Sequence, residues 1–132
     1  MSANALYLDS SALVKLVIEE PESVALQEFL GDRPIRISCV LAQVEVVRAV
    51  RPHGEKAVDG ARSLLADVDL IHLDEEVLQR AAIIGSEELR TLDAIHLAAA
   101  SLLAGDDLHL VTYDRRMSAA ARELGLSVFA PA

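Results

Sequence analysis

The sequence predicts an α/β protein, a three-layer α/β/α sandwich around a short, mainly parallel central sheet. Short apolar segments of strand length alternate with amphipathic segments of helix length along the whole chain, and this alternation is typical of parallel β-α-β units. The 132 residues are 52% hydrophobic, which is enough for one core. No linker, repeat or low-complexity segment interrupts them, so we expect one domain over residues 1–132.

The expected strands are short apolar or alternating runs, as in sheets buried on both faces. They lie at Ala5–Leu8, Ile35–Ser38, Val68–Leu73, Leu108–Thr112 and Leu126–Phe129.

The expected helices lie between these strands and have recognisable ends. Ser10 or Ser11 can cap the first helix and Asp74 a later one, while Pro52 should end the third. The expected segments are Ser11–Val17, Pro21–Leu30, Val40–Arg51, Glu55–Ala66, Asp74–Ile84, Asp93 to near Gly105, and Asp114–Leu124.

The chain is acidic, with a formal charge of −9 from 21 acidic residues against 12 Lys and Arg. A general nucleic-acid binder needs a basic surface, so this charge argues against such a binder and allows bound cations or a basic partner. Cys39 is the single cysteine, which excludes an intrachain disulfide and favours a reducing compartment. The N-terminus does not resemble a secretory signal, and no apolar run approaches the ~20 residues of a membrane span. We therefore expect a cytoplasmic protein without membrane contact.

Four carboxylates stand out by position. Asp9 directly follows the first expected strand, and Asp114 follows the strand that ends at Thr112. Glu45 lies inside a strongly apolar helix, and Asp93 begins another. Ligand sites of parallel sheets form at the carboxyl ends of the strands, so all four acids can be placed at one sheet edge.

Each acid also has a purely structural explanation. Asp9 and Asp114 could simply cap the helices that follow them. Asp93 could be a first-turn acid favoured by the helix dipole, and Glu45 could pair with Arg48 one turn later. Together, however, four carboxylates at one edge would repel each other unless a cation lay among them.

Mg²⁺ or Mn²⁺ is the cation that oxygen ligands favour. The four histidines are scattered without zinc spacing, and His96, one turn after Asp93, is expected to form structural hydrogen bonds outside the metal shell. A carboxylate-bound Mg²⁺ can activate water and neutralise charge on a phosphodiester. The residue pattern alone therefore predicts a metal-dependent hydrolase or phosphotransferase.

Four segments, in order along the chain, resemble the PIN-domain ribonucleases, specifically the VapC-type toxins of bacterial toxin–antitoxin pairs. They are Tyr7–Leu16, Val40–Val50 with Glu45, Leu92–Ala98 and Val111–Met117. The third and fourth segments together are specific to that family, and the four segments are spread in the family's order over most of the chain, from Tyr7 to Met117.

The resemblance implies a PIN-like α/β/α fold and an acidic cluster, formed by the matching Asp9, Glu45, Asp93 and Asp114, that binds Mg²⁺ or Mn²⁺. It implies an endoribonuclease in which metal-activated water cleaves single-stranded RNA to a 5′-phosphate and a 3′-hydroxyl. It also implies a homodimer, and a toxin that inhibits translation or growth until a cognate antitoxin inhibits it.

The resemblance extends to residues near the cluster. Ser10 and Thr112 match small hydroxyl positions beside the metal. Arg115 and Arg116 stand where many PIN domains carry a further acid, which leaves the number of metals open and puts positive charge where Arg115 can contact RNA. We expect the antitoxin to offer a basic C-terminal segment that inserts Arg or Lys among the carboxylates.

Other classes fit less well. A haloacid-dehalogenase-like phosphatase needs a second Asp where Ser11 stands. A receiver domain needs an acidic pair after the first strand and a late lysine, whereas Lys56 is the last lysine. A non-catalytic PIN-like module that binds protein or RNA is the stronger alternative, although such proteins usually lose cluster acids.

Overall fold

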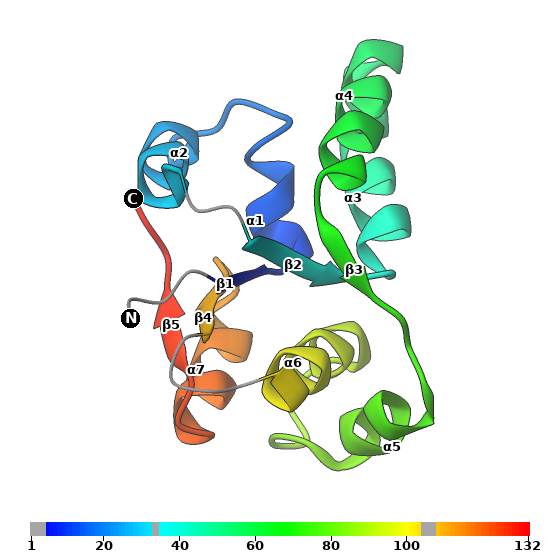
Figure 1. Ribbon diagram of the computed structural model, residues 1–132, viewed down its shortest axis with the longest axis vertical. Coiled ribbons are helices and arrows are strands. Elements are labelled where there is room, and N and C mark those ends of the chain that lie inside the picture. Colours follow the sequence, from blue (N-terminus) through cyan, green and yellow to red (C-terminus); the bar gives the residue numbers. More distant parts are fainter. Residues whose placement is uncertain (1–4, 33–34, 104–107) are drawn as a thin grey trace.

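The computed structural model describes residues 5–32, 35–103 and 108–132 (Figure 1). Within these residues the strands form one sheet in the order β3-β2-β1-β4-β5, and every neighbouring pair is parallel. The strands are β1 (Ala5–Leu8), β2 (Ile35–Cys39), β3 (Asp69–Ile71), β4 (Leu108–Val111) and β5 (Ser127–Phe129). The predicted parallel sheet is confirmed, with β3 shorter than expected.

Helices cover both faces of the sheet (Figure 1). One layer holds α1 (Ser10–Val14), α2 (Ser23–Leu30), α3 (Ala42–Val50), the 3₁₀ turn η1 (Arg51–His53) and α4 (Glu55–Ala66). The other layer holds α5 (Glu75–Ile83), α6 (Thr91–Leu103) and α7 (Arg115–Glu123). The predicted three-layer α/β/α architecture is confirmed.

Two apolar cores meet at the sheet, one on each face. Leu6 and Leu8 of β1 pack with α1, α3 and α4, whereas Tyr7 between them packs with α6 and α7. Successive strand residues point to opposite faces, and both faces are covered here. This is why β1 is apolar throughout and does not alternate with polar residues.

Two local details differ from the sequence predictions. Asp9, rather than Ser10 or Ser11, caps α1, because its side chain accepts a hydrogen bond from the Ala12 amide. The α-helix α3 ends at Val50, just before Pro52 as predicted, but Pro52 itself lies inside the 3₁₀ turn η1 that follows. The predicted end of the Asp93 helix near Gly105 falls outside the described residues.

Asp74 caps α5 as predicted, accepting a bond of 3.0 Å from the Val77 amide. In the described part of the chain, no helix has both the length and the apolar character needed to cross a membrane.

Candidate functional site

The carboxyl ends of β1 and β4 lie side by side at the centre of the sheet. Leu8 and Val111, the last residues of the two strands, are register partners. Asp9 follows Leu8 directly, and the segment from Thr112 to Asp114 follows Val111. The predicted placement of Asp9 and Asp114 at one sheet edge is therefore confirmed.

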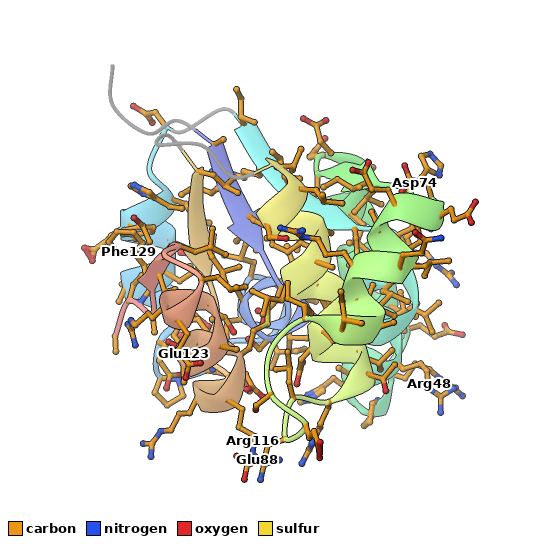
Figure 2. All side chains as sticks on the ribbon, turned by 90° about the horizontal axis from the view of Figure 1, so that it is seen from below. Arg48, Asp74, Glu88, Arg116, Glu123 and Phe129 are labelled. Atoms are coloured by element: carbon orange, nitrogen blue, oxygen red, sulfur yellow. The ribbon has the colours of Figure 1, made fainter. Side chains whose placement is uncertain are left out.

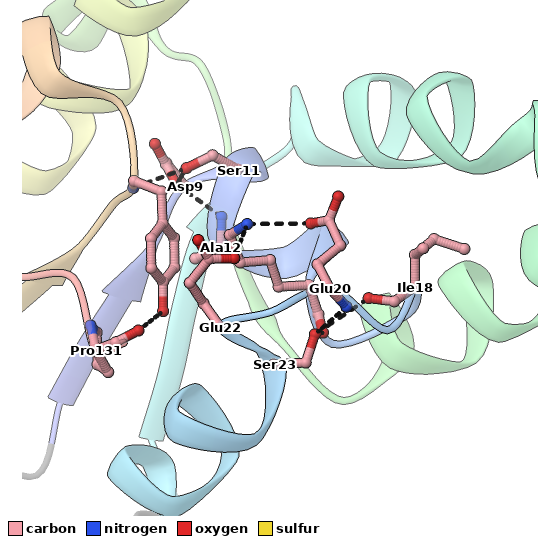
Figure 3. A network of polar contacts seen from close by, with 10 residues as sticks. Asp9, Ser11, Ala12, Ile18, Glu20, Glu22, Ser23 and Pro131 are labelled. Carbon is pink, nitrogen blue, oxygen red and sulfur yellow. Dashed lines mark hydrogen bonds and ion pairs between the residues drawn. The ribbon is translucent and has the colours of Figure 1, made fainter.

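Asp9 is almost completely buried, with 3% of its surface exposed. Its Oδ1 accepts hydrogen bonds from the Ser11 hydroxyl (2.6 Å) and the Ala12 amide (3.0 Å) (Figure 3). Its Oδ2 accepts a hydrogen bond from the Thr112 hydroxyl (2.5 Å). Burial raises the pKa of Asp9, and these hydrogen bonds partly oppose the rise. The protein thus holds a buried carboxylate in one fixed orientation.

Asp114 has two roles in the described structure. Its side chain caps α7 by accepting a bond of 2.8 Å from the Met117 amide. Its own amide donates to the Thr112 hydroxyl at 3.1 Å, the same hydroxyl that bonds Asp9. One threonine side chain therefore connects the two acids that follow β1 and β4.

Glu45 reaches this edge from α3, in the opposite helical layer to α6. Its Oε1 accepts hydrogen bonds from the Ser10 hydroxyl and from Nε2 of His96, each at 2.6 Å. Glu45 therefore pairs with His96 and not with Arg48, which is exposed on α3. The predicted hydrogen-bonding role of His96 is confirmed.

His96 is buried between polar groups of three elements. Its Nδ1 lies 2.8 Å from the Tyr7 hydroxyl and 3.6 Å from the Cys39 sulfur. Although burial opposes the charged form, the contacts with Cys39 and Glu45 raise the pKa of His96 to about 10. Burial likewise opposes ionisation of Glu45, but the bonds from His96 and Ser10 lower the pKa of Glu45 overall.

Asp93 lies in the first turn of α6, which begins at Thr91. Its side chain is partly buried, and burial raises its pKa. The negative charges of Asp114, Asp9 and Glu45 raise this pKa further, while His96 lowers it. Each of the other three predicted acids is thus close enough to disfavour ionisation of Asp93.

The chemistry of these donors fits a hard divalent cation. The groups are carboxylate oxygens, the ligands that Mg²⁺ and Mn²⁺ prefer, and their mutual repulsion would fall if a cation lay among them. No three His, Cys, Asp or Glu side chains in the described residues already form a metal cage. Asp9, Glu45 and Asp114 each accept at least one hydrogen bond from the protein, so closing a metal shell would require side-chain rotation.

Arg115 and Arg116 begin α7, next to Asp114, and both are exposed. They line a surface cleft together with Glu88 and Glu123, and Arg116 and Glu88 lie at the same end of the molecule in Figure 2. The two arginines therefore place positive charge near the site, and neighbouring acids partly offset this charge.

Sequence reasoning missed two residues of this site. Tyr7 was assigned only to a strand, yet its hydroxyl bonds His96. Ser11 was considered only as a cap, yet its hydroxyl donates to Asp9 and accepts from the Tyr113 amide at 3.0 Å. A tyrosine within a fully buried strand was the available signal, because a buried hydroxyl needs a hydrogen-bond partner.

Comparison with known proteins agrees with this geometry. The PIN domain model matches residues 6–123. Ribonuclease VapC46 of Mycobacterium tuberculosis is 51% identical over 127 residues, covering 96% of this chain and 98% of the relative. Ribonuclease VapC35 of the same species is 43% identical over 131 residues, covering 96% of each chain. The chain therefore belongs to the PIN-domain family, in the branch of the VapC ribonucleases.

Solved structures give the same fold. The crystal structure of M. tuberculosis VapC20, described as a sarcin-ricin loop cleaving toxin, matches with a TM-score of 0.74 and 16% identity over 88% of this chain and 95% of that one. A toxin–antitoxin complex from Klebsiella pneumoniae contains a chain that matches with a TM-score of 0.70 and 22% identity, over 97% and 98% of the two chains. These matches establish the α/β/α PIN fold.

Proposed function

We propose that this chain, acting as a single PIN domain, is a Mg²⁺- or Mn²⁺-dependent endoribonuclease and the toxin of a toxin–antitoxin pair. The observation that carries the proposal is the buried Asp9, which Thr112 orients and which, together with Asp114 and Glu45, repels Asp93. A carboxylate cluster with a buried member is costly for a fold alone and useful for binding a cation. The identity with VapC ribonucleases supports the same activity.

Asp9, Glu45, Asp93 and Asp114 are the residues that would hold the cation. When bound, such a cation activates water and neutralises the charge that develops on a phosphodiester. The water oxygen would lose a proton and form a bond to phosphorus while the bond from phosphorus to the 3′-oxygen breaks and that oxygen takes up a proton, which would leave a 5′-phosphate and a 3′-hydroxyl.

The neighbouring side chains act by position. Thr112 and Ser11 hold Asp9 with hydrogen bonds that favour its ionised form. Ser10 holds Glu45 in the same way. Arg115, exposed beside Asp114, attracts the RNA backbone, as a guanidinium binds phosphate well.

The remaining proposals concern partners. We infer an RNA substrate in the cytoplasm, a homodimer, and inhibition of growth or translation that a cognate antitoxin relieves. The net charge of −9 and the acidic site suit an antitoxin segment whose Arg or Lys enters among the carboxylates. An antitoxin without basic residues in its inhibitory segment that still inhibits fully would contradict this mode of inhibition.

The experiment is RNA cleavage by purified protein with Mn²⁺, comparing wild type with Asp9→Asn and Asp93→Asn. Both variants should retain the fold by circular dichroism and lose cleavage by at least about 100-fold, similar to the loss of other key groups that stabilise transition-state charge. Asp59→Asn, on the exposed surface of α4, is the matched control and should cleave normally. Normal cleavage by either site variant would refute the assignment.

A second outcome would indicate a different function for the chain. If wild-type protein with Mn²⁺ leaves every RNA intact while binding a protein partner tightly, the chain is a non-catalytic PIN-like binding module.

A further inference from the structure

Both hydrogen bonds to Glu45 end on the same oxygen atom. The Ser10 hydroxyl and His96 Nε2 each lie 2.6 Å from Oε1. In the described chain, no side chain or amide donates to Oε2. The carboxylate therefore has one oxygen held by the protein and one oxygen available to a ligand.

The chemistry of the two partners determines which atom carries the proton between His96 and Glu45. An ionised carboxylate only accepts hydrogen bonds, so Nε2 must carry the hydrogen that faces Oε1. In the neutral ring Nδ1 then accepts from the Tyr7 hydroxyl, and in the charged ring Nδ1 donates to it. In both states the Nε2 hydrogen points at Glu45.

The imidazole itself is rigidly placed. His96 is 2% exposed, and its ring meets the Tyr7 ring edge-on at a centroid separation of 5.9 Å and an angle of 78°. Tyr7 comes from the central strand β1, His96 from α6 and Glu45 from α3, so the chain of contacts joins the sheet to both helical layers. Such a ring has little freedom to turn away from Glu45.

We propose that His96, supported by Tyr7 and acting together with Ser10, is a positioning residue that holds Oε1 of Glu45 so that Oε2 alone is presented to the divalent cation. This inference rests on the proposed function. His96 does not touch the cation or the RNA but restricts Glu45 to a single ligand oxygen. Outer partners of metal ligands typically contribute 10- to 100-fold to metal affinity.

The competing explanation is that Glu45 and His96 form a buried polar pair that only stabilises the fold. The two explanations differ in what a conservative replacement restores. Gln at position 96 retains an N–H donor, whereas Leu has none. A positioning role needs the donor, while packing needs only a side chain of suitable volume.

The test is Mn²⁺ titration of the full chain without RNA, with free Mn²⁺ followed by electron paramagnetic resonance. His96→Leu should weaken Mn²⁺ binding by about 10- to 100-fold, and His96→Gln should recover most of the loss. His72→Leu, at an exposed histidine after β3, is the matched control and should bind like wild type. Folded His96→Leu protein with wild-type affinity, or His96→Gln no better than His96→Leu, would overturn the proposal.

A measurement on wild-type protein covers the case in which His96→Leu fails to fold. In nitrogen-15 NMR spectra Nε2 of His96 should carry a proton, and its resonance should shift on Mg²⁺ addition and saturate together with the rest of the site. An unprotonated or unresponsive Nε2 would overturn the proposal. If wild-type protein binds Mn²⁺ and cleaves RNA, and His96→Leu binds Mn²⁺ equally well, only the positioning role of His96 is refuted. If wild-type protein binds no Mn²⁺, the proposed function is refuted, and the positioning role of His96 is refuted with it.

Discussion

The Thr112 hydroxyl donates a hydrogen bond of 2.5 Å to Oδ2 of Asp9, although 103 residues separate the two in sequence. Each residue directly follows a strand, and the parallel pairing of β1 with β4 brings them together. The same hydroxyl accepts from the Asp114 amide. A single oxygen atom thus links the two acids that follow these strands.

Replacement of Thr112 tests this link. Thr112→Val retains the shape but removes the donor to Asp9, so the free energy of unfolding should fall by about 1.5–3 kcal/mol, the usual contribution of a hydrogen bond to a charged group. Mn²⁺ affinity should fall as well, because Asp9 is then less well oriented. Thr112→Ser, which retains the hydroxyl, is the control for both measurements, made by urea denaturation and metal titration. A Thr112→Val protein as stable as wild type would show that the bond contributes little.

Asp114 allows its capping and ligand roles to be separated. Asn caps helices about as well as Asp, so Asp114→Asn should leave stability nearly unchanged, whereas Asp114→Ala should lose ~1 kcal/mol through the bond to the Met117 amide. Both variants lack the carboxylate and should bind Mn²⁺ weakly. Urea denaturation and Mn²⁺ titration of the same three proteins test this. An Asp114→Asn protein with wild-type Mn²⁺ affinity would make Asp114 a cap alone.

Asp93 should make the metal-free protein less stable as the pH rises. Burial and the charges of Asp114 and Asp9 raise the pKa of Asp93 in the folded protein. The folded state therefore binds the Asp93 proton more tightly than the unfolded state does, and this stabilisation is fully present below the unfolded pKa of about 3.9. The stabilisation is lost as the pH rises through the folded-state pKa. In EDTA, Asp93→Asn should therefore match wild type near pH 4 and melt at a higher temperature by pH 7–8.

Mg²⁺ should reverse the order of the two melting temperatures at neutral pH. A ligand that binds only the folded state stabilises that state, and wild-type protein should bind Mg²⁺ better than Asp93→Asn does. Melting temperatures from pH 4 to 8, with and without Mg²⁺, give the answer. If Asp93→Asn is the less stable protein in EDTA at pH 8, Asp93 forms a favourable interaction and the inferred repulsion is wrong.

Arg115 should act on RNA binding rather than on chemistry. Removing one phosphate contact lowers the magnitude of the slope of log affinity against log salt concentration by about one. Arg115→Ala should therefore raise KM for RNA, make KM less dependent on salt and leave kcat nearly unchanged. Arg122→Ala, two turns along the exposed side of α7, is the matched control. Equal salt slopes for wild type and Arg115→Ala would exclude Arg115 from the RNA contact.

The sequence alone determined the strands and the acids that follow them. Apolar runs such as Ala5–Leu8 are suited to burial, and Asp9 and Asp114 lie near strand ends because Asp9 comes directly after one strand and Asp114 three residues after another. Local hydrogen bonding also follows from sequence, as the Asp74 cap shows. Glu45 and Asp93 also stand out in the sequence, as acids on strongly apolar helices, and the resemblance to PIN domains assigns them to the same cluster as Asp9 and Asp114.

Only the tertiary structure decided the partners of Glu45 and of Asp9. Helical spacing offered Glu45 the nearby Arg48, but the fold gave it His96, 51 residues away. The reason is physical: α3 and α6 lie in opposite layers and meet at the sheet edge, where a partly buried carboxylate is favourably paired. Likewise, Tyr7 and Thr112 acquired their roles from the order and register of parallel strands, which no local pattern records.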